Sequence, residues 1–401
     1  MVPEHLLAEL DARLRPVDAA RLAAFPGEPS SRQPVHTCYV PADAVVPGLV
    51  AGWGSAALAA LDEHGLPDLG LDAGLVAQVL PRVRAKLATE PVEDLRVDAE
   101  DGYRGAPDDE DGDVTAAAAV LAAEPALPPF LGVRAKSLEE ATRRRGVRSL
   151  DLFLTGLAGA GRERAVVTLP KVTAVEQVSA FLPVLDALQD ATGLALDLEL
   201  QVETPQAVLG PDGTATLARM LHAGAGRVTG LHYGTYDYSA SLGIAAAHQS
   251  SDHPAADAAK EAMQVAVAGT GARAVDGSTN VLPVGPTAEV HAAWQLHARL
   301  VRRALERGFY QGWDLHPAQL VTRYVATYAF FRAALPAAAA RLAAYVSRVE
   351  GGVLDEPATA RALATVVLRG LDCGALDVAE VEQATGLDRP ALDALAGRRP
   401  R

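Results

Sequence analysis

Two carboxylates stand where neighbouring apolar runs of this sequence end. Glu203 closes the run LDLELQVETP, and Asp237 follows the next apolar run in LHYGTYDYSASLG. Carboxylate oxygens suit a hard divalent cation such as Mg²⁺, which takes one or two of them and completes its octahedron with water and substrate oxygens. Taken alone, the two acids more simply cap a following helix and a turn. Their position relative to other polar residues therefore decides between the two interpretations.

Charged residues also end most of the other apolar runs. If these runs are the parallel strands of a barrel, their ends meet at one mouth, where the chemistry of (β/α)8 enzymes takes place. In chain order the residues are Asp98, Glu100, Asp101, Arg134, Lys136, Lys171, Asp276, Asp314 and His316. We expect His316 to be a structural hydrogen-bonding residue rather than a base. So many charges at one mouth indicate binding or catalysis.

The elements that would position these residues alternate in the manner of βα units. Eight predicted strands span 37–40, 95–100, 130–134, 165–169, 196–202, 228–233, 272–275 and 310–315. The predicted helices between them include 53–64, 74–88, 113–123, 174–190, 252–268 and 287–307. Eight strands allow a closed barrel or an open doubly wound sheet. The polar strand ends favour a (β/α)8 TIM barrel.

The sequence divides into three predicted parts. An N-terminal helical extension covers 1–35, the catalytic barrel 36–333, and a C-terminal helical cap 334–401, interrupted at Gly351-Gly352. Leucines at helical spacing in the extension predict amphipathic helices that pack on the barrel. They are Leu6, Leu7, Leu10 and Leu14.

Composition excludes two classes of partner. The 401 residues carry a formal net charge of −14 at pH 7, which disfavours nucleic acid and anionic membrane surfaces and points to a small-molecule partner. No apolar run reaches the roughly 18 residues of a spanning helix, and the start MVPEHLLAELDARL has acids where a signal peptide needs bases. We therefore expect a cytoplasmic protein. Cys38 and Cys373 are too few for a disulfide framework or a structural zinc site.

Two further segments have distinctive patterns. The acidic stretch 107–113 predicts a solvated loop. Residues 376–395 have the rhythm of a helix-turn-helix, which would suit a DNA-binding regulator. Acids dominate that segment and repel phosphate, so we expect it to be a packing module.

Seven separated motifs share their order with one known family. They are CYVPAD (38–43), VDAEDG (97–102), GVRAKS (132–137), LPKV (169–172), VETP (202–205), YGTYDYSASLG (233–243) and GFYQGWDLHPAQ (308–319). Each ends a predicted strand or follows directly from one. Together they resemble the HpcH/HpaI aldolase/citrate lyase family, which includes the citrate lyase beta subunit and malyl-CoA lyases, and this chain looks like a divergent member.

The resemblance implies a site and a reaction. Glu203 and Asp237 would hold Mg²⁺ or Mn²⁺, Arg134 would bind the substrate carboxylate or enolate oxygen, and Asp98, Glu100 and Asp101 match the acidic cluster near the metal. We expect Glu100 or Asp101, or a metal-bound water, to act as the base. The implied activity is a metal-dependent carbon-carbon lyase acting on a 2-oxo or hydroxy acid, or its acyl-CoA thioester, through a metal-stabilised enolate. The family also implies a homo-oligomer, commonly a trimer or hexamer.

One departure and two alternatives stand beside this interpretation. Residues 311–315 read Gln-Gly-Trp-Asp-Leu where citrate lyase relatives have Gly-Lys-Trp, and the missing lysine weakens the case for coenzyme A. Lys171 offers a Schiff-base aldolase, since a desolvated lysine at the mouth can attack a carbonyl. A non-catalytic metabolite-binding or regulatory protein with the helix-turn-helix-like module is the other alternative.

Overall fold

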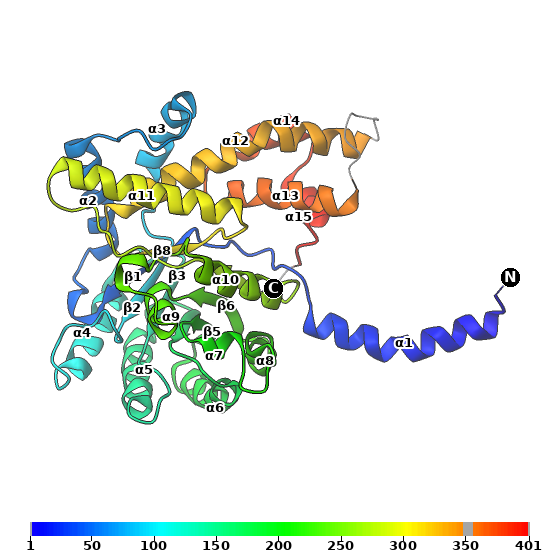
Figure 1. The fold of residues 1–401 in the computed structure, drawn as a ribbon, viewed down its shortest axis with the longest axis horizontal. Helices are drawn as coiled ribbons and strands as arrows, with labels where there is room; N and C mark the ends of the chain where they lie inside the picture. Colours follow the sequence, from blue (N-terminus) through cyan, green and yellow to red (C-terminus); the bar gives the residue numbers. More distant parts are fainter. Residues whose placement is uncertain (1, 348–355, 400–401) are drawn as a thin grey trace.

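The computed structural model describes residues 2–347 and 356–399, so the predicted break at Gly351-Gly352 lies outside the described residues. Eight parallel strands form the central sheet (Figure 1). They are β1 (His36–Pro41), β2 (Asp94–Asp98), β3 (Phe130–Arg134), β4 (Arg164–Leu169), β5 (Ala195–Val202), β6 (Val228–Tyr233), β7 (Arg273–Val275) and β8 (Gly312–Asp314).

The sheet curls into a nearly closed barrel. Its strand order is β7-β6-β5-β4-β3-β2-β1-β8, with every neighbouring pair parallel. At the remaining seam the Asp276 N–H donates to the Gln311 carbonyl at 2.9 Å, which links the end of β7 to the start of β8. The predicted (β/α)8 barrel is confirmed.

Helices surround the barrel and follow most of the strands. They are α2 (Leu49–His64), α3 (Ala73–Thr89), α4 (Glu110–Ala123), α5 (Arg143–Leu157), α6 (Val175–Thr192), α7 (Pro205–Val208), α8 (Thr216–Ala223), α9 (Thr235–Ser241), α10 (Pro254–Val267) and α11 (Thr287–Glu306), with short 3-10 turns at Ala42–Ala44 and Ala246–His248. Outward strand residues such as Val97, Val133 and Val167 are buried beneath them. Apolar packing between strands and helices therefore forms the main core.

The inward strand positions carry a charged layer instead. Arg96 is fully buried, ion-pairs with Asp94, and donates to Glu199 Oε2 at 2.9 Å. His232 Nε2 lies 3.2 Å from Glu199 Oε1. Burial would raise the pKa of Glu199, but the charge of Arg96 holds it well below its usual range. Opposite charges thus balance within this layer of the barrel.

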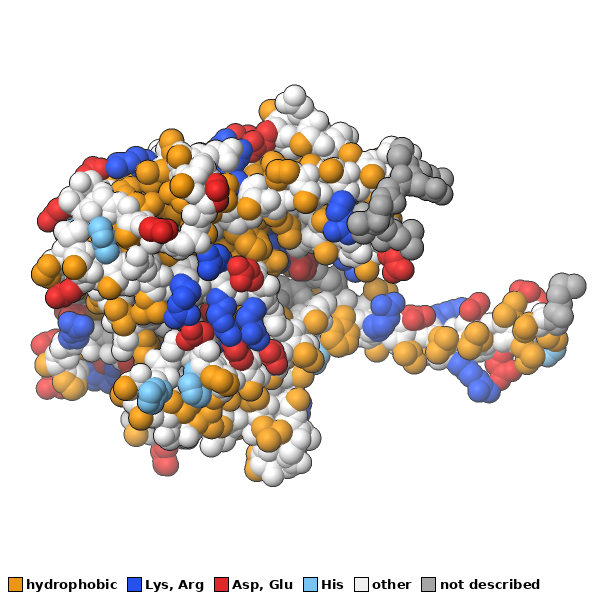
Figure 2. Space-filling view, turned by 45° about the horizontal axis from the view of Figure 1, so that its top comes forward, with side chains coloured by type: hydrophobic (Ala, Val, Ile, Leu, Met, Phe, Trp, Pro, Cys, Tyr) orange, Lys and Arg blue, Asp and Glu red, His pale blue; other side chains and the backbone are white. Residues whose placement is uncertain are grey.

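The N-terminal helix α1 (Glu4–Ala24) stands away from the barrel as an arm (Figures 1 and 2). None of its residues is buried, and Leu10 and Leu14 are 51% and 45% exposed. The prediction that this extension packs on the barrel is wrong for the single chain. Helical periodicity indicates an apolar face, but it does not say which surface covers that face.

The acidic stretch 107–113 is not wholly a solvated loop, because α4 begins inside it at Glu110. The Glu110 side chain is buried and accepts hydrogen bonds from Ser149 Oγ at 2.6 Å and Arg145 Nε at 2.7 Å. Lys136 Nζ lies 3.0 Å from the same carboxylate. Acids are favourable in the first turn of a helix, and partners distant in sequence allow this one to be buried.

In the described residues after β8 the structure has four helices, namely α12 (Gln319–Ser347), α13 (Pro357–Asp372), α14 (Val378–Thr385) and α15 (Arg389–Ala396). Gly386, in the left-handed conformation, joins the last two. Both pack inward, with α14 on α12 and α15 on α13. Arg389 and Arg398 pair with Asp372, so the expected packing role fits this segment.

Helix α12 runs through the predicted boundary at 333/334, and the three-part division remains a prediction. By length and composition α12 could cross a membrane, with a mean hydropathy of 1.2 in a window that is 28% buried. The expectation that no segment reaches this length is therefore wrong. A helix in the core of a folded domain can meet the same criteria of length and hydropathy. Helix α12 contacts the barrel directly, because its Arg323 donates to Asp314 Oδ1 at 3.0 Å.

Candidate active site

A cavity of about 470 Å³ opens where the carboxyl ends of the strands meet. Four carboxylates and two arginines are among its lining residues. They are Asp98, Asp101, Glu203, Asp237, Arg104 and Arg134. Glu100 and Lys171 join this group through direct contacts with Arg134 and Asp101. The structure therefore brings together all six site residues predicted from the sequence.

Arg134, at the end of β3, is held by Asp98 at the end of β2. Its Nε donates to Asp98 Oδ1 at 2.7 Å, and its Nη2 contacts the other carboxylate oxygen. Burial alone would lower the pKa of Arg134, but the charge of Asp98 raises it well above its usual value. The remaining nitrogen, Nη1, has looser partners, with Gln201 Oε1 at 3.4 Å and Glu100 Oε2 at 3.7 Å. The Arg134 guanidinium is thus held in place by Asp98, while its Nη1 is only weakly bonded and can donate to another group.

Lys171 ties together the two acids that follow β2. Its Nζ donates to Glu100 Oε1 at 2.6 Å and to Asp101 Oδ2 at 2.5 Å. Burial raises the pKa of the Glu100 carboxyl, although Arg134 and Lys171 oppose the shift. Burial would likewise raise the pKa of Asp101, but Lys171 lowers it below its usual value. The two neighbouring acids therefore differ in their affinity for a proton.

Glu203 and Asp237 follow the carboxyl ends of two neighbouring strands, β5 and β6. Glu203 is only 2% exposed, and burial raises the pKa of its carboxyl to about 8 against the opposing charges of Arg134 and Lys171. The negative charge of Asp237 adds to the same shift. Asp237 lies in the first turn of α9 with a side chain that is 43% exposed. Burial therefore disfavours the charged form of Glu203, and a cation held nearby would favour it.

Local backbone geometry brings the predicted residues close together. Lys171 adopts a left-handed φ of 51°, an uncommon conformation for a non-glycine residue, and its N–H donates to Glu203 Oε2 at 3.0 Å. A Cβ at Gly234 would lie 2.3 Å from Glu203 Cγ, and one at Gly102 would lie 2.2 Å from Asp98 Oδ2. β5 ends at Val202, directly before Glu203, and Thr204 then caps α7 with Pro205 in its first turn.

Four other polar residues from the strand ends lie outside this cavity. Lys136 reaches Glu110 beside α4, and Lys260 Nζ lies 2.9 Å from Asp276 Oδ1. Asp314 is fully buried among Arg323, His36 and His297. Side chains alternate across a strand, so Trp313 faces the barrel and Asp314 faces the helices. His316 Nδ1 accepts from the Ala318 N–H at 3.2 Å, as a structural residue would.

Sequence reasoning missed several aromatic and polar residues of the cavity. The rings of Tyr39 and Trp313 pack against each other in a tilted arrangement, with centroids 4.6 Å apart. The Arg134 guanidinium lies 4.9 Å from the centre of the Tyr39 ring. Tyr236 accepts from the Asn280 N–H at 2.5 Å on the opposite wall. Tyr39 and Trp313 sit on predicted strands, so the inward alternation could have revealed them.

One other group of described residues has the composition of a metal site. Ligand atoms of His36, Cys38 and Asp314 all lie within 4.8 Å of one another. The Arg323 guanidinium already neutralises Asp314, and burial raises the pKa of the Cys38 thiol well above its usual value. Because metal binding needs the thiolate, this group is better explained as a buried hydrogen-bonded network.

Solved structures of two enzymes share this architecture. A citrate lyase from Burkholderia xenovorans LB400 is similar with a TM-score of 0.58 and 20% identity, covering 91% of this chain and 96% of its own. A malate synthase from Haloferax volcanii reaches a TM-score of 0.50 and 16% identity, covering 75% of this chain and 76% of its own. This structural similarity shows that the fold is shared, and the shared fold agrees with the one that the sequence motifs led us to expect.

The sequence comparisons identify a family without a described activity. No curated protein matches the chain. Residues 14–400 match the family described as "Domain of unknown function (DUF6986)", and this match spans both the barrel and the C-terminal helices. The chain therefore belongs to the DUF6986 family.

Proposed function

We propose that this protein is a Mg²⁺- or Mn²⁺-dependent carbon-carbon lyase that acts on a 2-oxo or hydroxy acid or its acyl-CoA thioester. The observation that carries the proposal is Glu203, a buried carboxylate with a raised pKa beside Asp237 at the mouth of the barrel. The enzymes that share this fold, a citrate lyase and a malate synthase, support the same reaction class by analogy.

Glu203 and Asp237 are the residues that would hold the metal ion. Both offer oxygen donors, which hard divalent cations prefer, and both line one cavity where substrate and water can complete the coordination. Burial raises the pKa of Glu203, and the negative charge of Asp237 adds to the shift, so a bound cation would favour the carboxylate form. When bound, the metal ion supplies positive charge next to the substrate oxygen that becomes negative during cleavage.

Arg134 would bind the acidic group of the substrate. Asp98 holds two of its nitrogens, which fixes the plane of the guanidinium, and Nη1 remains loosely bonded. A planar guanidinium matches a carboxylate or an enolate oxygen. The rings of Tyr39 and Trp313 lie against Arg134 and exclude water from this side. Arg134 would therefore orient the substrate and stabilise the charge that develops on it.

Glu100 is the better candidate for the base. Burial raises the pKa of its carboxyl, so it holds a proton more readily than Asp101. In cleavage, Glu100 would accept the proton of the substrate hydroxyl. The hydroxyl-bearing carbon then becomes a carbonyl, the adjacent carbon-carbon bond breaks, and its electron pair remains on the departing fragment as an enolate. The proton can return from Glu100 to the enolate carbon.

The contacts of Lys171 oppose the Schiff-base alternative. Burial would lower the pKa of the Lys171 amine, but Glu203 and Glu100 raise it well above its usual value. An ammonium held by two carboxylates is protonated and has no lone pair for attack on a carbonyl. We therefore assign Lys171 a positioning role, in which it orients Glu100 and Asp101.

The remaining parts of the proposal concern the setting of the enzyme. A cavity of about 470 Å³ suits a small acid or the acyl end of a thioester. We propose a homo-oligomer, trimeric or hexameric, in the cytoplasm. The negative formal charge of −14 supports a small-molecule substrate over nucleic acid.

A coupled assay tests the activity. The purified chain is incubated with hydroxy acids that carry a carbonyl or a coenzyme A thioester β to the hydroxyl group, and released 2-oxo acid is measured with and without Mg²⁺. Chelation should abolish turnover, and added Mg²⁺ should restore it. Glu203→Gln should lower kcat/KM by at least about 1000-fold, because each mutation at an electrostatic centre of this kind removes several kcal/mol.

Glu163→Gln is the matched control, since Glu163 is exposed at the start of β4 and should leave turnover unchanged. Turnover that resists chelation would contradict the metal assignment. Borohydride trapping of the protein with its oxo acid would instead establish the Lys171 chemistry. Unchanged activity in Glu203→Gln would contradict the site itself.

A further inference from the structure

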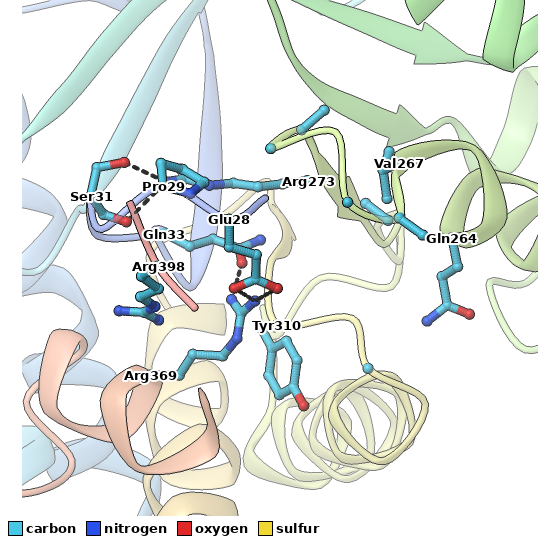
Figure 3. Close-up of a pocket in the computed structure, with 16 residues that line it drawn as sticks. Glu28, Pro29, Ser31, Gln33, Gln264, Val267, Arg273, Tyr310, Arg369 and Arg398 are labelled. Carbon is cyan, nitrogen blue, oxygen red and sulfur yellow. Dashed lines mark hydrogen bonds and ion pairs between the residues drawn. The ribbon is translucent and has the colours of Figure 1, made fainter. Parts of the chain in front are cut away.

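A second cavity, of about 220 Å³, lies at the opposite end of the barrel, next to the amino ends of β7, β8 and β1 (Figure 3). Its walls come from the segment 28–33, the loop between α10 and β7, helix α13 and the C-terminal segment. Three arginines and one glutamate line it, namely Arg273, Arg369, Arg398 and Glu28. Cationic side chains thus dominate this cavity.

Arg369 is the central cation of the cavity. Its Nη1 donates to Gln33 Oε1, and its Nη2 lies 3.3 Å and 3.4 Å from the two oxygens of Glu28. The guanidinium lies 4.3 Å from the centre of the Tyr310 ring, and among the described residues its buried Nε has no hydrogen-bond partner. The contact with Gln33 is short, but the Glu28 carboxylate lies farther away than the roughly 2.7–2.9 Å of a close charged pair.

The carboxylate that faces Arg369 is loosely held. The Glu28 side chain is 49% exposed, whereas that of Arg369 is 13% exposed. Burial lowers the pKa of Arg369, and the charges of Glu28 and Asp372 do not offset this shift. Glu28 can therefore swing out to solvent at little cost, and its place can be taken by another anion.

Two further arginines approach the same space. Arg398 Nη1 pairs with Asp372 Oδ2 at 3.0 Å, while its Nε is buried and without a hydrogen-bond partner in the described part of the chain. Arg273 Nη2 donates to the carbonyl of Arg32 at 2.6 Å, which holds the segment 28–33 against β7. Figure 3 shows Arg369 directed at Glu28 and Arg273 directed at Ser31, with Arg398 lying beside them on a third segment.

We propose that this cavity binds a small oxyanion of the phosphate class, free or as the phosphoryl group of a small metabolite. Phosphate oxygens can accept from several guanidinium groups at once, whereas Glu28 offers only two oxygens. A cavity of about 220 Å³ admits a phosphate with little more attached. The Glu28 carboxylate is the internal group that this anion displaces.

The bound anion would join three distant parts of the chain. Pro29 and Arg399 form a parallel bridge beside the cavity, so the two ends of the family match meet there. Arg369 belongs to α13, and Arg273 begins β7. An anion held by both arginines would fix the C-terminal helices to the amino end of the barrel, far from the candidate active site. Binding should therefore raise the thermal midpoint without affecting Mg²⁺ binding.

Calorimetric titration of the full chain with inorganic phosphate, at constant ionic strength in chloride, tests the proposal. Saturable binding is expected. Arg369→Gln should weaken it at least about tenfold, because a charge-assisted hydrogen bond is lost. Glu28→Gln should tighten it by about three- to tenfold, because a competing like charge is removed. This opposite change cannot come from a damaged fold, so it decides the test even if Arg369→Gln does not fold.

Controls locate the bound phosphate. Arg219→Gln, which changes an arginine 52% exposed on α8, should leave the affinity unchanged. Arg104→Gln, which changes an exposed arginine of the cavity at the other end of the barrel, should also leave it unchanged, and weakened binding there would place the phosphate at that end and overturn the proposal. No saturable binding, or equal affinities in Glu28→Gln and Arg369→Gln, would overturn it too. A parallel titration with glycerol 3-phosphate distinguishes an esterified from a free phosphate, and binding of either supports the site.

Discussion

The two ends of this barrel have opposite charge. At the carboxyl end four carboxylates and two arginines line a cavity of about 470 Å³, whereas at the amino end three arginines and one glutamate line a cavity of about 220 Å³. Between them Arg96 is balanced by Asp94 and Glu199 in a closed layer. The cavity at the carboxyl end is therefore lined by an excess of acidic side chains and the cavity at the amino end by an excess of basic ones.

The two ends also differ in how firmly their ion pairs are made. At the carboxyl end Asp98 and Arg134 are both buried and share two hydrogen bonds. At the amino end Glu28 is half exposed and approaches Arg369 only at 3.3 Å. A tight pair fixes a guanidinium in place, and a loose pair leaves one available to an external anion. The following variants test this difference.

The largest effect is expected from Arg134→Ala. It leaves Asp98 buried without its counter-ion, which should cost about 3–5 kcal/mol of unfolding free energy. Urea unfolding followed by circular dichroism measures this loss. Adding Asp98→Asn to the same variant should restore part of the stability, and a double variant as unstable as the single one would show that the pair is not the cause.

Gly234→Ala should have the next largest effect. The added methyl group would meet Glu203 Cγ at 2.3 Å, so the carboxylate or the start of α9 must move. We expect a loss of about 1–3 kcal/mol of stability and weaker metal binding. Gly52→Ala is the matched control, because the space around its Cβ position is open. Equal behaviour of the two variants would show that the close approach to Glu203 is unimportant.

A pH titration of metal affinity tests the charge of Glu203. Because its carboxyl has a pKa of about 8 without metal, the proton must leave before a cation binds. Mn²⁺ affinity should therefore fall about tenfold for each pH unit below that value. The affinity is measured at intervals of about one pH unit between pH 6 and 8. A Mn²⁺ affinity that stays constant over this range would contradict the raised pKa of Glu203.

The same group predicts the pH dependence of stability in chelator. The folded-state pKa of Glu203 is raised from the ordinary value of 4.5 to about 8. Its contribution to stability is therefore fully present below pH 4.5 and is lost as the pH rises through about 8. Glu203→Gln should flatten the slope of the unfolding free energy over this range, while Glu163→Gln should not.

The smallest effect is expected from Glu28→Gln. Its pair with Arg369 is half exposed, so its loss should change the unfolding free energy by less than about 1 kcal/mol. Urea unfolding in phosphate-free buffer measures it. A loss as large as that of Arg134→Ala would show that the two pairs are equally firm and would remove the contrast between the two ends.

Much of the fold followed from the sequence. Predicted strands 130–134 and 228–233 coincide with β3 and β6, because both are short, largely apolar runs of the length typical of buried strands. The order of charged residues also predicted which side chains meet at the mouth. Residues after strands of a parallel barrel share one end whatever the details of packing.

Other features depend on contacts that periodicity does not report. The inward charges Arg96 and Glu199 lie in runs that read as apolar, and their partners lie on different strands. We expected Asp314 at the mouth of the barrel. Because side chains alternate along a strand and Trp313 faces inward, Asp314 faces outward. The cavity around Arg369 combines residues from both ends of the chain, and no local pattern could predict that arrangement.

Manganese titration of the purified protein, followed by electron paramagnetic resonance of the free ion, tests the central claim most directly. One Mn²⁺ should bind per chain, Glu203→Gln and Asp237→Asn should each weaken it by at least about 100-fold, and Glu163→Gln should have no effect. Undiminished binding in both Glu203→Gln and Asp237→Asn, or no binding by the unmodified chain, would contradict the assignment of these carboxylates as the metal ligands.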